Sequence, residues 1–126
     1  MAGKLDEGME AITEAILGAA FDVSHHLGAG FLENLYKRAL LKELRLRRLA
    51  VQEEVPFQVR YKGEPIGTYF ADLLVERQVI VELKVAEAIN DAHVHQVVNY
   101  LKASGLRVGL ILNFGVPRVA VRRVLL

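Results

Sequence analysis

The first third of the chain repeats its apolar residues at intervals of three and four. Leu5 and Ile16 are two of these positions, and the spacing predicts an amphipathic helix over residues 5–27. We expect the Gly-Ala-Gly segment at 28–30 to end this helix, because glycine commonly terminates helices. The same period returns afterwards and predicts a second helix over residues 32–48.

From residue 51 the apolar period changes from three or four to two. The alternation in EEVPFQVRYK predicts a strand, and Pro56 favours an edge position for it. KGEPIG supplies turn residues, and GTYFADLLV at 67–75 is expected to return as the second strand of a hairpin. ERQ then forms a tight turn into VIVELKV at 79–85. Residues 51–85 are therefore predicted to form a three-stranded antiparallel meander.

The rest of the chain predicts one helix between two strands. Asn90 is a suitable N-cap for a helix over 91–104, which Ser104-Gly105 would end. LRVGLILNF is an apolar strand that we expect to be central and buried, and VAVRRVLL is a final strand at or near an edge. A strand–helix–strand unit of this length allows a crossover, so part of the sheet should be parallel.

The predicted order of elements is ααβββαββ, which is an α/β fold. It corresponds to a mixed β-sheet with flanking helices in a single domain over residues 1–126. Cysteine is absent, which excludes structural disulfides, thiolate catalysis and cysteine-ligated zinc. The N-terminal residues carry acids through their apolar positions, and no stretch reaches the roughly 20 apolar residues that span a bilayer. We therefore expect a cytoplasmic protein without a membrane partner.

The net charge of +1 conceals two basic clusters. One lies in the second predicted helix and the other near the C-terminus. Such clusters can contact nucleic-acid phosphates, whereas the simpler interpretation is solvated cations on a helix end. The candidate contacts are Lys37, Arg38, Lys42, Arg45, Arg47, Arg48, Arg118, Arg122 and Arg123.

Two charges interrupt the apolar strand VIVELKV. Glu82 and Lys84 are two residues apart and therefore share one face of the strand. A turn centred on residue 77 would set Asp72 of the preceding strand opposite Glu82 on that same face. Opposed carboxylates are destabilising unless something compensates them, and a hard divalent cation such as Mg²⁺ is the simplest compensator. A solvated strand face and a structural ion pair remain the alternatives.

Three further polar residues could belong to the same site. Gln96 and Tyr100 lie on one face of the predicted third helix, and Glu33 opens the second. Taken alone, each has an ordinary structural explanation: a surface or core-edge residue on a helix, or a favourable acid in a first helical turn.

Taken together, these residues resemble the PD-(D/E)xK nuclease superfamily. Asp72 corresponds to its acidic residue and Glu82-Leu83-Lys84 to its ExK motif, although Ala71 stands where a proline is usual. More narrowly, the chain resembles the small bacterial GxxExxY proteins, because GFLENLY at 30–36 matches that motif letter for letter. The resemblance extends from about residue 8 to the C-terminus.

The resemblance implies a restriction-endonuclease-like core and a role for each site residue. Glu33, Asp72, Glu82 and the Leu83 carbonyl would bind Mg²⁺ or Mn²⁺, and Lys84 would orient the attacking water. Gln96 and Tyr100 match a QxxxY motif that related nucleases place beside the metal. These roles favour a metal-dependent DNA nuclease, structure-selective or non-specific in its cleavage and acting as a homodimer. A non-catalytic module that binds nucleic acid or protein is the alternative.

Overall fold

A computed structural model describes residues 6–126 and contains the predicted sequence of three helices and five strands. Leu5, which we assigned to the first helix, lies outside the described residues. The helices are α1 (Glu7–Leu27), α2 (Glu33–Leu46) and α3 (Asp91–Ser104). The strands are β1 (Val51–Tyr61), β2 (Glu64–Val75), β3 (Val79–Lys84), β4 (Val108–Asn113) and β5 (Ala120–Leu125).

The strands form one mixed sheet in the order β1-β2-β3-β4-β5. All neighbouring strands are antiparallel except β3 and β4, which are parallel because α3 carries the chain back between them. This confirms the predicted α/β class, the meander and the crossover. β1 and β5 are the two edges, and every residue of β4 is buried.

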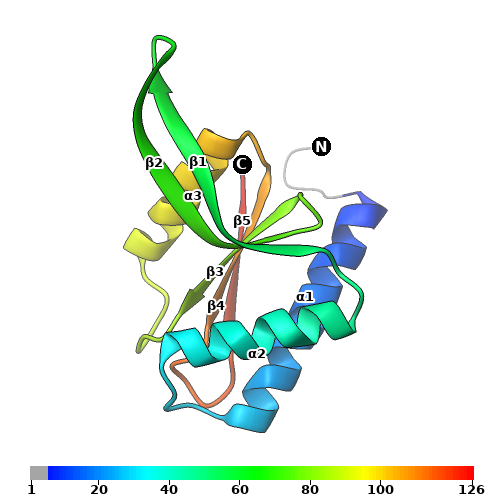
Figure 1. Cartoon of the computed structure of the whole chain (residues 1–126). Helices are drawn as coiled ribbons and strands as arrows, with labels where there is room; N and C mark the ends of the chain where they lie inside the picture. The colour runs from blue at the N-terminus through cyan, green and yellow to red at the C-terminus, as the bar shows by residue number, and fades with distance from the viewer. Residues whose placement is uncertain (1–5) are drawn as a thin grey trace.

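Helices cover both faces of the sheet (Figure 1). α1 and α2 pack on one face, where their core includes Ile16, Leu40, Leu73 and Val81. α3 packs on the other face, where Val97 and Leu101 contact a second core that includes Ile80. None of the helices within residues 6–126 has both the length and the hydropathy to cross a bilayer.

Local signals determine the ends of α3 as predicted. Asn90 caps its N-terminus by accepting from the backbone N–H of His93, and the His93 side chain accepts in return from the Asn90 N–H. Gly105 ends the helix in the left-handed conformation at φ 77°. His93 therefore has a structural role in the helix cap.

The turn is shorter than the KGEPIG segment predicted. Lys62 and Gly63 alone form the turn, with φ angles of 48° and 83°, and β2 already begins at Glu64. Two successive left-handed residues make a two-residue hairpin turn whose twist suits the flanking strands. The result is a long β1–β2 hairpin that projects beyond the rest of the sheet and runs beside α3 (Figure 1).

Candidate active site

Asp72 and Glu82 lie where β2 and β3 separate. The two strands pair from Val75 and Val79 as far as Leu73 and Val81, so the same register sets Asp72 opposite Glu82. At Asp72 and Glu82, hydrogen bonds to side chains replace the backbone hydrogen bonds between β2 and β3. The Asp72 N–H donates to Glu82 Oε1 over 2.9 Å, and the Leu83 N–H donates to Asp72 Oδ2, also over 2.9 Å. Each carboxylate is thereby held against the opposite strand.

The backbone is also distorted on the other side of Asp72. β1 and β2 pair on both sides of Glu54 and Asp72 but not at these two residues, and Glu54 has a φ of 51°. Val51 packs on the α1–α2 face, whereas Val55, an even number of residues away, packs on the α3 face. Beyond this distortion, side chains that would have faced α1 and α2 face α3 instead. The apolar residues of the hairpin therefore point toward α3.

Burial makes the Asp72–Glu82 pair electrostatically unusual. Glu82 is only 2% exposed. Desolvation, and then the negative charge of Asp72, raise the pKa of Glu82 from its ordinary 4.5 to about 9, while Lys84 acts in the opposite direction. At neutral pH the pair therefore retains a proton. A cation bound between the carboxylates would displace that proton.

Lys84 connects this pair to α3. Its ammonium donates to Gln96 Oε1 over 2.7 Å, and Gln96 Nε2 donates to the Tyr100 hydroxyl over 2.9 Å. None of the ion pairs within residues 6–126 involves Lys84. Desolvation and the charge of Glu82 raise the pKa of Tyr100 to about 12, so its hydroxyl stays protonated. The structure thus brings Lys84, Gln96 and Tyr100 into one chain of hydrogen bonds.

Glu33 belongs to α2, which packs on the face of the sheet opposite α3. It comes near the Asp72–Glu82 pair but does not contact it. It is the first residue of α2, whose N-terminal end lies near the end of β3 (Figure 1). Desolvation and then the charge of Asp72 raise the pKa of Glu33, and Lys84 lowers it, so all three groups are within electrostatic reach. Within the described part of the chain, however, no three His, Cys, Asp or Glu side chains gather closely enough to hold a metal ion. Glu33 is not brought into direct contact with the predicted metal ligands.

The GFLENLY segment has a clear structural role. The Tyr36 hydroxyl donates to the Gly28 carbonyl and accepts from the Phe31 N–H at 3.2 Å. Its ring is fully buried and stacks on Phe114 with ring centroids 4.8 Å apart. Tyr36 therefore fixes the loop between α1 and α2, and with it the position at which Glu33 begins α2.

Oxygen donors suited to a hard divalent cation are present at this site. Mg²⁺ takes one or two carboxylates and keeps several waters, so Asp72 and Glu82 suffice as charged ligands. The N–H and C=O of a strand residue point to the same side, and the Leu83 N–H points to Asp72. The Leu83 carbonyl therefore lies on the side of the carboxylate pair as well. The residues fit a Mg²⁺ or Mn²⁺ site with two carboxylates and one carbonyl.

The basic residues divide into two groups. Lys37 is 8% exposed and pairs with Glu54, and Arg38 pairs with Glu53. Arg47 pairs with Asp22 at 2.6 Å and with Glu43 at 3.3 Å, and Arg123 pairs with Glu10 at 3.3 Å. These four cations form ion pairs within the chain, which neither the nucleic-acid interpretation nor that of solvated cations predicted, and Lys37 is too buried to meet a nucleic acid. Among the nine predicted contacts, those that are exposed and outside the ion pairs of residues 6–126 are Lys42, Arg45, Arg48, Arg118 and Arg122.

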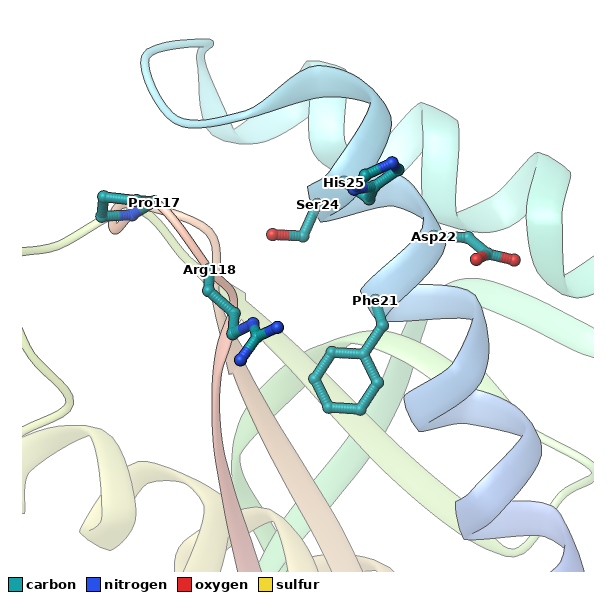
Figure 2. A pocket seen from close by; sticks show the side chains of 6 residues that line it. All are labelled: Phe21, Asp22, Ser24, His25, Pro117 and Arg118. Carbon is teal, nitrogen blue, oxygen red and sulfur yellow. The ribbon is translucent and has the colours of Figure 1, made fainter.

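Arg118 borders a pocket of about 510 Å³ between the end of α1 and the β4–β5 loop. Its guanidinium extends across the gap toward α1 and Phe21, whereas the carboxylate of Asp22 points away from it (Figure 2). Ser24 ties the two segments together by accepting from the Val119 N–H over 2.9 Å. This hydrogen bond fixes the β4–β5 loop against α1, and the Arg118 side chain extends from that loop.

Asn113 is a site-supporting residue that the sequence analysis missed. It is fully buried, and its amide both accepts from the N–H of Ala86 and donates to the Ala86 carbonyl, each at 3.0 Å. It lies beside Lys84 in the parallel β3–β4 register. An asparagine in the otherwise apolar LILNF was the available signal. Asn113 fixes the loop that follows the ExK motif.

The profile of the PD-(D/E)XK nuclease superfamily matches residues 10–124, nearly the whole chain. The protein belongs to this superfamily, as the carboxylate pair and the lysine on one strand face had indicated. No curated protein matches the sequence. Membership in the narrower GxxExxY group stays a prediction.

A solved structure shares the fold. It is titled "Crystal structure of SSO0001" and superimposes with a TM-score of 0.59 at 16% sequence identity. The match covers 73% of this chain and 48% of that one, so the chain spans about half the length of its structural relative. At this identity the likeness concerns the fold alone, and it agrees with the restriction-endonuclease-like core.

Proposed function

We propose that this protein is a Mg²⁺- or Mn²⁺-dependent nuclease that hydrolyses DNA phosphodiester bonds. The observation that carries the proposal is the arrangement of Asp72, Glu82 and Lys84. Two opposed carboxylates, one of them almost fully buried, lie beside an ammonium that forms no ion pair in the described chain. Carboxylate oxygens are the charged ligands that Mg²⁺ prefers, and a cation beside them can stabilise the charge that develops on a phosphate.

Each residue then has a defined task. Asp72, Glu82 and the Leu83 carbonyl would hold the metal ion, which supplies Lewis-acid polarisation and a bound water of lowered pKa. Lys84 orients a water and stabilises the negative charge that develops on the phosphate. Gln96 holds the Lys84 ammonium in place. Tyr100 accepts from Gln96, which leaves its own hydroxyl proton free to donate to a phosphate oxygen.

Glu33 and the exposed cations act farther from the reacting phosphate. Glu33 is near enough to Asp72 for the charge of Asp72 to raise the pKa of Glu33, and we assign Glu33 to the water around the metal rather than to direct coordination. Lys42, Arg45, Arg48, Arg118 and Arg122 would contact the nucleic-acid backbone without regard to sequence.

One observation favours a non-catalytic module as the second candidate. Within residues 6–126, no buried side-chain nitrogen or oxygen lacks a hydrogen-bond partner. The Asp72–Glu82 pair therefore already joins β2 to β3 without a metal, which a binding domain could use for stability alone.

Cleavage of plasmid, single-stranded and branched DNA under a titration of Mg²⁺ and Mn²⁺ distinguishes the two candidates. Asp72→Asn and Lys84→Ala should each abolish metal-dependent cutting. The matched controls Asp91→Asn and Lys62→Ala make the same charge changes at exposed positions on α3 and the hairpin turn, and should cut normally. If no substrate is cut and the metals leave the melting temperature unchanged, the nuclease proposal is wrong.

A further inference from the structure

A second pocket, of about 470 Å³, lies between the β1–β2 hairpin and α3. This volume is within the range of small-molecule sites, roughly 300–1,000 Å³. Its walls come from three elements that the distortion at Glu54 and Asp72 brings together. The lining residues are Gln58, Val59 and Arg60 of β1, Tyr69 of β2, and Asn99, Lys102 and Ala103 of α3.

The pocket combines an aromatic ring with positive charge. Tyr69 is 36% exposed, so part of its ring is open to a ligand. Of the lining residues in the described part of the chain, Arg60 and Lys102 are cationic and none is acidic. Arg60 is held in place by donating to the Gly63 carbonyl and to Gln58, and both of these acceptors are uncharged. The positive charge of Arg60 is therefore positioned but not neutralised by a neighbouring carboxylate.

Side-chain contacts connect a residue of the pocket wall to the candidate active site. The rings of Tyr69 and Tyr100 are in contact, with centroids 5.2 Å apart. Tyr100 is bonded to Gln96, which is bonded to Lys84. A strand that occupies the pocket would therefore follow α3 past Tyr100 and Gln96 to reach the carboxylate pair.

We infer that this pocket binds an unpaired nucleotide of the substrate, with its base stacked on Tyr69 and its phosphate between Arg60 and Lys102. An aromatic ring within a pocket can stack only on a base that has left the duplex, whereas the bases of a duplex remain covered by their neighbours. The substrate class is then a single-stranded nucleic acid or a single-stranded segment of a branched one. This inference names the substrate of the proposed nuclease and rests on that proposal.

Binding can be measured separately from cleavage by fluorescence anisotropy in EDTA. The probes are a labelled oligothymidine, an oligouridine of the same length and a duplex of the same length. Tyr69→Ala should weaken oligothymidine binding roughly 5- to 150-fold, as expected for the loss of one base–aromatic stack, and leave the duplex affinity unchanged. Tyr61→Ala is the matched control, because Tyr61 lies on the same hairpin, is 60% exposed and does not line the pocket.

The two cations give an independent readout. Arg60→Gln with Lys102→Gln should reduce the slope of log affinity against log salt by about 0.7 for each lost phosphate contact with a single strand. Tyr69→Ala should weaken binding without changing this slope. The same losses with oligouridine would extend the pocket to RNA, whereas losses confined to oligothymidine would restrict it to DNA; either result supports the pocket.

The outcomes separate the two proposals. Binding that depends on Tyr69, in a protein that cuts nothing with any metal, supports the pocket and overturns the nuclease. Cleavage combined with equal effects of Tyr69→Ala and Tyr61→Ala overturns the pocket and leaves the nuclease standing. Tighter binding of the duplex than of the single strand also overturns the pocket. Melting curves of each variant verify that it is folded.

Discussion

Lys84 reaches across to α3 and donates to Gln96 over 2.7 Å, and it forms no ion pair with the two carboxylates on its own side of the sheet. A lysine held by a neutral amide keeps its full charge available to a ligand. An ion pair with Asp72 or Glu82 would instead screen that charge. The position of the Lys84 ammonium therefore depends on a residue of a different element.

Replacing Gln96 should lower turnover through Lys84 without removing any charge. Gln96→Leu deletes the acceptor, and we expect kcat to fall roughly 10- to 100-fold, as when groups that orient catalytic ligands are lost, with KM little changed. Steady-state cleavage of a single-stranded substrate measures both constants. Gln78→Leu, in the exposed β2–β3 turn, is the control and should retain activity. A rise in KM at constant kcat would show that Gln96 binds substrate instead.

The raised pKa of Glu82 predicts how stability depends on pH. The folded state prefers protonated Glu82, so this contribution is complete below about pH 4.5 and is lost as pH rises toward 9. The melting temperature of the wild type should therefore fall relative to that of Glu82→Gln between these values. Differential scanning fluorimetry of both proteins across pH 5–9 measures the difference. Parallel profiles would contradict the raised pKa.

The same shift couples the metal to protons. A cation favours ionised Glu82, so its binding must release the proton that the pair retains. The rise in melting temperature produced by a fixed Mg²⁺ concentration should increase from pH 6 to pH 9. In Glu82→Gln that increase should disappear. An equal rise at every pH in the wild type would show that Mg²⁺ binds elsewhere.

Local rules predicted the parts of the site that depend on neighbours in sequence. Strand parity and a tight turn placed Asp72 opposite Glu82, and capping residues gave the bounds of α3, because each depends on a few adjacent residues. Two features depend on distant contacts and were missed. Lys37 looked like a solvated helix cation, but it is buried against Glu54. Tyr69 lies on the Tyr100 side of the sheet because β2 exchanges faces at Asp72, where Leu73 packs toward α1 and α2 but Ala71, two residues away, packs toward α3.

The left-handed backbone of Glu54 can be tested by comparing two replacements. Glu54→Ala and Glu54→Gly both remove the partner of Lys37, but only glycine adopts a φ of 51° without strain. We expect the glycine variant to be more stable than the alanine variant by about 1 kcal/mol in urea unfolding. At Glu53, whose φ is not positive, the order should reverse, because glycine weakens an ordinary strand. The same order at both positions would contradict a strained Glu54.

Gly115 permits the close approach of two loops beside the site. A Cβ there would lie 2.4 Å from the N and 2.5 Å from the O of Ala86, in the loop that Asn113 holds after Lys84. Both clashing atoms are backbone, so Gly115→Ala must displace the loop, and we expect a loss of about 1–3 kcal/mol in the free energy of unfolding. Lys84 would move with the loop, so cleavage should fall as well. Gly67→Ala, where a Cβ meets nothing within 4 Å, is the matched control and should leave both stability and cleavage unchanged. Wild-type stability and cleavage in Gly115→Ala would show that the loop adjusts freely and does not fix Lys84.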